Sequence, residues 1–280
     1  RWVVDSERSA QTDDRVLPVT RVVAALLVPV LALAFVVLFF EARDTGDHFA
    51  WTIRPAMTPV VMASGYLGGA YYFARMASGA RWHETGVVLP AVSVFATVMM
   101  LATIILWDKF NHGHIAFWLW VILYIVAPPL VFGLWLLNRS RDPHVTDEGD
   151  PVTPGAGRLA LLAVAGVTLV IAIGLFLRPV AWSGWWPWAL SPLTARVMSG
   201  WFALAGTASI LLARDRRASS WTIPLEATIV WAAFLGLGAL RYRSAFDGSV
   251  ERVLFLLVVG AWLVGFLMLR FRALKGGPSL

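Results

Sequence analysis

Two tryptophan–proline motifs are the residues of this sequence best suited to bind a ligand. Trp51-Thr-Ile-Arg-Pro55 recurs in the second half of the chain as Trp188-Ala-Leu-Ser-Pro192. Three more tryptophans precede the second motif: Trp182, Trp185 and Trp186. An indole ring is largely apolar, carries one N–H donor and favours the membrane–water interface. The motifs therefore predict interfacial anchors, which is the base expectation, or the aromatic wall of a pocket for a lipid, a quinone or another flat ligand.

Glu226 is the second candidate, because it lies two residues after Pro224 at the start of an apolar run. A carboxylate in hydrocarbon is costly unless it is paired, so its presence there suggests either a salt bridge or a proton or substrate site. The nearest basic residues along the chain are Arg214, Arg216 and Arg217. We expect one of these to be its partner, and both interpretations stay open.

The sequence does not predict a metal, haem or catalytic site. It has no cysteine, and His112 and His114 are two residues apart, a spacing that points side chains of a helix in different directions. No histidine pair lies deep in an apolar run, as a bis-histidine haem would need. The phosphate-loop, zinc-protease and serine-hydrolase motifs are also missing. We therefore assign no catalytic residue and no metal ligand, leave the cofactor unknown and disfavour an enzyme.

The composition places these candidates in a membrane protein. Of 280 residues, 59% are hydrophobic and 14% are charged, whereas a soluble domain has about a quarter of its residues charged. The net charge of +6 is spread in small groups between apolar runs, which excludes a basic patch for nucleic acid. Membrane lipids are the expected partners, and other membrane subunits are an open alternative.

The apolar runs predict the elements that position the candidates. A hydrocarbon layer of about 30 Å takes about 20 apolar residues, and in lipid such runs form helices. We predict an all-α fold with eight transmembrane helices at residues 19–40, 57–73, 87–107, 115–137, 159–177, 193–213, 221–240 and 253–269.

The distribution of Lys and Arg predicts the orientation. An even number of spans places both termini on one side of the membrane. The termini and the even-numbered loops together hold fifteen Lys and Arg residues, and the odd-numbered loops hold eight. Since positive residues favour the cytoplasmic side, we predict a multi-pass protein of the cell membrane with both termini in the cytoplasm.

The tryptophan–proline motifs belong to a longer internal repeat. Thr58-Pro-Val-Val-Met62 parallels Thr194-Ala-Arg-Val-Met198, and each is followed by Ser-Gly-aromatic. Phe110-Asn111 likewise parallels Phe246-Asp247. Because each unit has an even number of spans, the two copies insert the same way up. A pseudo-twofold axis along the membrane normal should relate them, as in parallel-repeat transporters.

The repeat divides the chain into five parts. A polar N-terminal segment (1–18) precedes the first four-helix repeat (19–137), and a proline-rich cytoplasmic linker (138–157) leads to the second repeat (158–272) and a tail (273–280).

Three functions fit these features. The leading hypothesis is a non-catalytic scaffold or accessory subunit that binds a lipid or a hydrophobic cofactor between its helices. The first alternative is a transporter or channel for a neutral or weakly charged small molecule, with its path between the two repeats. The scarcity of charge within the spans disfavours charged cargo. An intramembrane enzyme acting on lipid or quinone is the third.

Overall fold

The chain is helical throughout the part that the structure describes. The computed structural model describes residues 13–146 and 150–275, with side chains through Phe271. The long helices are α2 (Pro18–Phe40), α4 (Met57–Ala77), α6 (Leu89–Ile105), α7 (Ile115–Asn138), α8 (Gly155–Leu177), α10 (Pro192–Arg214), α11 (Ser219–Arg241) and α12 (Ser249–Lys275). The short ones are α3 (Thr45–His48), α5 (Trp82–Thr85), α9 (Pro179–Ser183), η1 (Gly86–Val88), η2 (Trp107–Lys109), η3 (Arg139–Arg141) and η4 (Arg243–Ala245). Within these ranges the chain forms two isolated β-bridges and no strand, so the predicted all-α class is confirmed.

Seven helical segments of the described chain are long and apolar enough to cross a membrane. They are Pro18–Phe40, Trp82–Ile105, Ile115–Arg141, Gly155–Leu177, Pro192–Arg214, Ser219–Arg241 and Ser249–Phe271. The predicted span 57–73 also forms a helix, α4, but it is not one of the seven. Three tyrosines and three glycines lower the apolar content of α4.

The surroundings of α4 explain its composition. Most of its residues are buried, because it packs against α2 and α11 and touches α10. A helix that faces other helices rather than lipid can carry small and polar residues, which let backbones approach closely. A Cβ atom on Gly68 would lie 2.7 Å from the carbonyl oxygen of Ala227, and one on Gly238 would lie 2.1 Å from Val60 Cγ1. Glycines thus bring α4 and α11 together.

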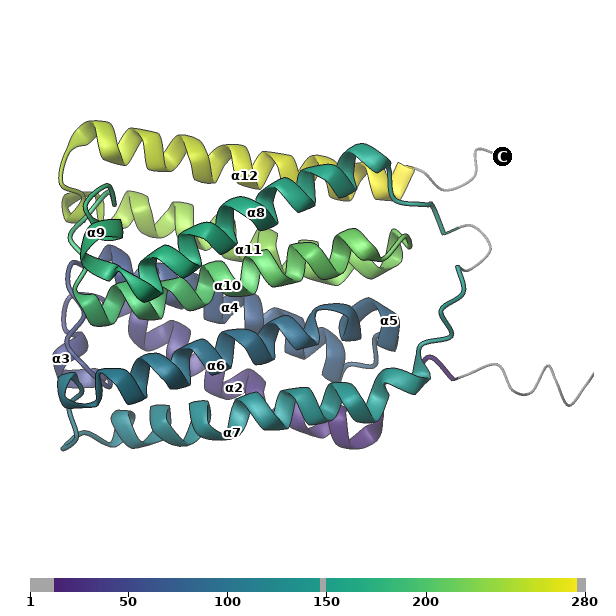
Figure 1. Ribbon diagram of the computed structural model, residues 1–280, viewed down its shortest axis with the longest axis horizontal. Coiled ribbons are helices and arrows are strands. Elements are labelled where there is room, and N and C mark those ends of the chain that lie inside the picture. Colours follow the sequence, from purple (N-terminus) through teal and green to yellow (C-terminus); the bar gives the residue numbers. More distant parts are fainter. Residues whose placement is uncertain (1–12, 147–149, 276–280) are drawn as a thin grey trace, which may run out of the picture.

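The long helices run side by side, and their connections gather at two ends of the molecule (Figure 1). One end, the linker end, holds α5, the linker and both ends of the described chain. The other, the tryptophan end, holds α3, α9 and the loops that carry Trp51 and Trp188. Pro18 starts α2 and Pro192 starts α10, where the missing N–H of proline costs nothing.

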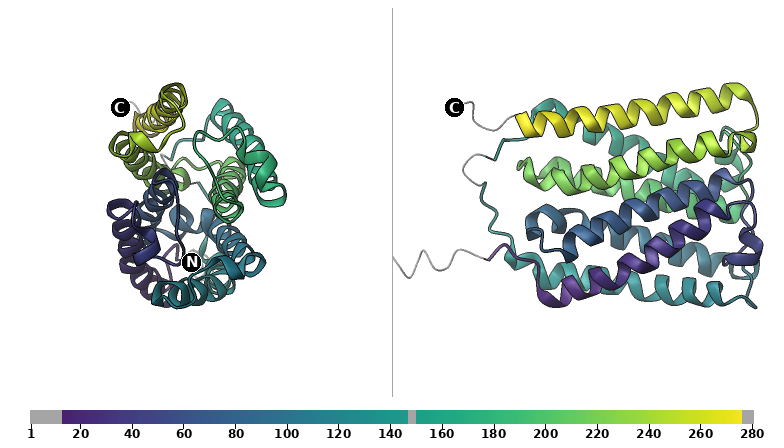
Figure 2. Two further views of the ribbon diagram at one scale, coloured as in Figure 1. Left: turned by 90° about the vertical axis from the view of Figure 1, so that its left-hand side faces the viewer. Right: turned by 180° about the vertical axis from the view of Figure 1, so that it is seen from behind.

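The pattern of helix neighbours is the same in both halves of the chain. In the first half α2 packs on α4 and α6 on α7; in the second, α8 packs on α10 and α11 on α12. The halves interlock, because α4 packs on α11 and α10 packs on α6. We call the space between the pairs α2/α4 and α6/α7 the first groove, and that between α8/α10 and α11/α12 the second groove. Viewed along the helices, α8 and α12 stand apart on either side of the second groove (Figure 2).

Three hydrogen bonds of the first half resemble three of the second half in donor, acceptor and spacing along the chain. Trp82 N donates to Asp14 O (3.0 Å), and Ala218 N donates to Pro151 O (3.0 Å). Arg21 Nε donates to Ala77 O (3.1 Å), and Arg158 Nε donates to Ala213 O (2.7 Å). Asn111 N donates to Ala50 O (2.8 Å), and Asp247 N donates to Pro187 O (3.1 Å). These pairs of hydrogen bonds lie at both ends of the bundle.

The halves meet at the linker end through a polar contact. His83 Nε2 lies 2.9 Å from Ser219 Oγ. The other ring nitrogen of His83 is hydrogen-bonded to Asp14, and Ser219 Oγ donates to Asp150 (2.6 Å). This contact joins the N-terminal segment, α5, the linker and the start of α11.

Candidate functional site

Trp51 and Trp188 lie in the core at the tryptophan end, and both are buried. The Trp51 ring packs against Phe110 and Trp120, with ring centroids 5.1 and 4.9 Å away. Trp188 packs against Phe246 and Phe255, each at 5.4 Å. Each tryptophan thereby fixes its loop to the next helical hairpin of the same half, α6–α7 or α11–α12.

The two motifs differ in polar contacts and in the place of the proline. Trp188 Nε1 donates to Thr58 Oγ1 of α4 (2.9 Å), so this loop also joins the two halves. Trp51 Nε1 is buried and has no hydrogen-bond partner in the described chain. Pro192 is the first residue of α10, whereas Pro55 precedes the first residue of α4 by two positions.

The three tryptophans that precede the second motif have different surroundings. Trp185 and Trp186 line a large cavity, and Trp182 packs against α8, where its ring covers Gly174. Trp188 does not line the cavity, but its ring packs against that of Trp186, with 5.5 Å between ring centroids. The structure thus brings two of the predicted wall residues to one cavity.

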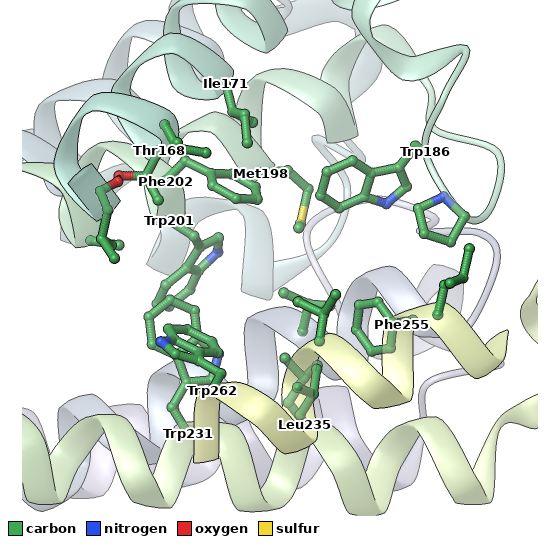
Figure 3. A pocket seen from close by; sticks show the side chains of 18 of the residues that line it. Thr168, Ile171, Trp186, Met198, Trp201, Phe202, Trp231, Leu235, Phe255 and Trp262 are labelled. Carbon is green, nitrogen blue, oxygen red and sulfur yellow. The ribbon is translucent and has the colours of Figure 1, made fainter. Parts of the chain in front are cut away.

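The cavity occupies the second groove and has a volume of about 770 Å³. Its walls come from α8, α10, α11, α12 and the loop 185–187, with Val61 of α4 at the inner side. Figure 3 shows Trp186 and Phe255 toward one side, Trp201, Trp231 and Trp262 toward the other, and Met198 between them. Aromatic and aliphatic side chains dominate the surface, which is the lining expected of a site for an apolar ligand.

The mouth of the cavity opens sideways between α8 and α12. Val167 of α8 and Leu254 and Val258 of α12 line the cavity, yet each is more than half exposed. Trp201, at 4% exposure, forms part of the deep wall. Because Trp185 and Glu251 also line it, the cavity lies toward the tryptophan end.

Few polar groups line the cavity. Thr168 donates its hydroxyl hydrogen to Val164 O of its own helix (2.7 Å). Glu251, in the first turn of α12, is the single charged residue among the lining side chains described. Three indole nitrogens on the walls, those of Trp186, Trp201 and Trp231, are buried and have no hydrogen-bond partner in the described chain. Apart from the Glu251 carboxylate and the Thr168 hydroxyl, the buried unpartnered polar side-chain groups on the described walls are these N–H donors.

A smaller cavity of about 180 Å³ adjoins the first. The two share Val164, Trp201, Ala205, Trp231 and Trp262. The smaller cavity continues between α4, α6, α10 and α11 to Pro224 and Leu225, toward the linker end. The rings of Trp201, Trp231 and Trp262 separate the two spaces.

Sequence reasoning missed the tryptophans that form the deep wall. Trp201, Trp231 and Trp262 lie within α10, α11 and α12 rather than at helix ends. Their position was itself a signal, because tryptophan is expected at membrane interfaces and not in mid-span.

Glu226 is paired, but the predicted partners were wrong. Its carboxylate accepts hydrogen bonds from Arg75 Nη1 of α4 (2.5 Å), Tyr71 Oη (2.6 Å) and Arg270 Nη2 of α12 (2.9 Å). Arg214, Arg216 and Arg217, its neighbours along the sequence, are not its partners. The carboxylate holds α4, α11 and α12 together at the linker end, while Trp188 holds Phe255 of α12 at the other end.

Arg217 has its own ion pairs at the linker end. It donates to Asp142 of the linker (2.6 and 2.8 Å) and to Asp215 (2.7 and 3.0 Å), and its side chain is 9% exposed. Burial raises the pKa of both carboxyls, but the hydrogen bonds from Arg217 outweigh it, so that the pKa values of Asp142 and Asp215 lie below their usual range. Burial lowers the pKa of Arg217, and its bonds to the two aspartates raise it more.

Among residues 13–146 and 150–275 we find no group of three or more His, Asp or Glu side chains that could hold a metal ion. No protein-family model, curated protein or solved structure matches the chain.

Proposed function

We propose that this protein is an accessory or scaffold subunit of the cell membrane that holds a lipid or another apolar molecule in the second groove. The observation that supports this proposal most strongly is the cavity of about 770 Å³, which is lined by aromatic and aliphatic side chains and opens between α8 and α12. A lipid chain from the surrounding bilayer would make packing contacts with the apolar walls of a cavity of this size.

The proposal includes an eight-span topology with α4 as the eighth span. Three features support it: α4 has 21 residues, it runs alongside α2 and α11, and its central position removes the need for a lipid-facing surface. With Lys and Arg more abundant at the linker end, the termini and the linker face the cytoplasm, so the second groove opens to the outer leaflet.

The proposal also includes duplication of a four-helix unit. The matching helix neighbours and the three pairs of similar hydrogen bonds in the two halves support it. An axis along the membrane normal relates the copies, because both insert the same way up.

A second candidate is passage of a small neutral molecule. The smaller cavity favours it, because together the two cavities reach from Trp185 near the tryptophan end to Pro224 near the linker end. The tryptophan rings between the cavities would then act as the gate.

Native mass spectrometry of the protein extracted in mild detergent tests the binding role. The Ala205→Phe variant fills the cavity, because Ala205 lines both spaces. Gly166→Phe is the matched control on α8, where a Cβ would meet no atom within 4 Å. We expect a bound apolar molecule in the unmodified protein and in the control, and little in Ala205→Phe. Equal retention by all three, or none by the unmodified protein, would contradict the proposal.

Copurification in the same preparation addresses the accessory role, because a stably associated membrane subunit supports it. Flux of a neutral solute in vesicles that Ala205→Phe abolishes would favour transport instead.

A further inference from the structure

The polar groups of the cavity wall restrict the chemistry of its ligand. An unpaired N–H is costly in a medium without water, so such groups are expected to find an acceptor. Three indole N–H groups of this wall have none within the described chain, those of Trp186, Trp201 and Trp231. A ligand that brings acceptor oxygens would satisfy them, whereas a plain hydrocarbon would not.

Trp201 is the best placed of the three donors. Its side chain is 4% exposed, and it packs between Gly65 of α4 and the ring of Trp231. Figure 3 shows its indole nitrogen on the side of the ring that faces Met198 and the cavity. Its N–H can therefore serve as a hydrogen-bond donor at the deep end of the site, away from water.

The charges of the lining disfavour an ionic head group. Glu251 is the single charged lining residue among those described, and it lies at the outer end. It would repel a phosphate, and a buried anion needs a cationic partner. Aromatic rings of Trp186, Phe202 and Phe255 border the same space and offer faces to a flat ring.

Given that the second groove binds an apolar molecule, as proposed above, we infer that this molecule is a neutral amphiphile of the quinone type. Its carbonyl oxygens accept hydrogen bonds from the indole N–H of Trp201 and its neighbours. Its planar ring lies among the aromatic side chains, and its isoprenoid tail leaves between α8 and α12.

Retention of defined probes by the intact, immobilised protein tests the inference. The probes are a short-chain menaquinone, the hydrocarbon that matches its tail, and dioleoylglycerol, which carries ester carbonyls without a planar ring. We expect saturable retention of the menaquinone and weaker retention of the other two. Trp201→Phe keeps an aromatic ring but removes the donor and should weaken menaquinone binding about three- to tenfold.

Trp51→Phe is the matched control, because its indole also lacks a partner in the described chain but lines neither cavity. We expect its affinity for the menaquinone to be unchanged. Trp231→Phe provides a second donor variant should Trp201→Phe fail to fold.

The outcomes separate the two proposals. Equal binding of the hydrocarbon and the menaquinone, or unchanged affinity of both donor variants, would overturn the quinone inference while leaving the binding role intact. Tighter binding of dioleoylglycerol would overturn it as well. Failure of every probe, together with no molecule bound after extraction, would remove the binding role itself.

Discussion

Each groove lies between two pairs of neighbouring helices, but side chains join the walls of the first groove, whereas the second holds the large cavity. In the first groove Tyr66 of α4 and Tyr124 of α7 share a hydrogen bond of 2.7 Å, and Trp120 packs on Tyr124 with 4.4 Å between ring centroids. Asn138 Nδ2, at the end of α7, donates to Thr20 Oγ1 of α2 (2.6 Å). Polar and aromatic contacts thus fix α7 along its length.

Fewer contacts of this kind hold the described part of α12 in the second groove. Eight residues of α7 are buried, whereas Val259 is the single buried residue of α12 up to Phe271. Helix α12 is held near its ends by Trp188 against Phe255 and by Arg270 against Glu226, and in its middle by Trp262 against Trp231. In the proposed function, the first groove is the rigid support and the second groove is the binding site.

Removing an aromatic side chain from each groove should give the largest contrast. Trp120→Ala leaves a void in the first groove and should destabilise the protein by about 3 to 5 kcal/mol. Trp262→Ala only enlarges the second groove and should cost less than about half of that. Thermal unfolding of both variants in detergent measures the contrast, and equal losses would show that the grooves are packed alike.

Breaking the arginine contacts at the linker end should give the next largest contrast. Arg217 is 9% exposed and holds two aspartates, whereas Arg15, in the first half of the chain, is 86% exposed and lies 3.3 Å from Asp13. Arg217→Met leaves two carboxylates unpaired and should cost about 2 to 3 kcal/mol. Arg15→Met should cost about 1 kcal/mol or less, as exposed pairs do. Similar losses in unfolding experiments would contradict this asymmetry.

Low pH should remove from the unmodified protein the stabilisation that the Arg217 ion pairs provide. Because the pKa values of Asp142 and Asp215 are lowered in the folded state, their ion pairs stabilise the protein above the usual aspartate pKa of about 4. This stability is lost as the pH falls through the lowered pKa values. The melting temperature should therefore fall more steeply below about pH 4 in the unmodified protein than in Arg217→Met. Parallel curves would assign the acid sensitivity to other groups.

The smallest contrast should come from the indole N–H groups of the two motifs. Trp188→Phe loses the hydrogen bond to Thr58 and should cost about 1 kcal/mol beyond the change in ring size. Trp51→Phe loses no hydrogen bond, because its N–H has no partner in the described chain. The difference between the two melting temperatures isolates the bond, and a larger loss for Trp51→Phe would reverse the assignment.

Much of the fold could be predicted from the sequence because the thickness of a bilayer fixes the length of an apolar run. This reasoning located seven spans, and it also located α4 as a helix, although the polar content of α4 reflects its shielding by neighbouring helices. The motif spacing singled out Trp51 and Trp188, but it did not predict that both rings are buried.

The site could not be predicted in full, because it is formed by residues that are far apart along the chain, and a single sequence does not reveal such contacts. Glu226 is paired with Arg75 and Arg270, which are far from it in sequence, while the prediction considered only its neighbours along the chain. The cavity exists because α12 lacks the inward contacts that Tyr124 gives to α7. Such a difference appears only once helices from both halves are placed side by side.

Cryo-electron microscopy of the protein in lipid nanodiscs would test the central claim most directly. The account predicts an elongated density in the second groove, entering between α8 and α12 and ending beside Trp201. It predicts none in the first groove, where Tyr66 and Tyr124 occupy the space. An α12 closed onto α8 with no density between them, or equal densities in both grooves, would contradict it.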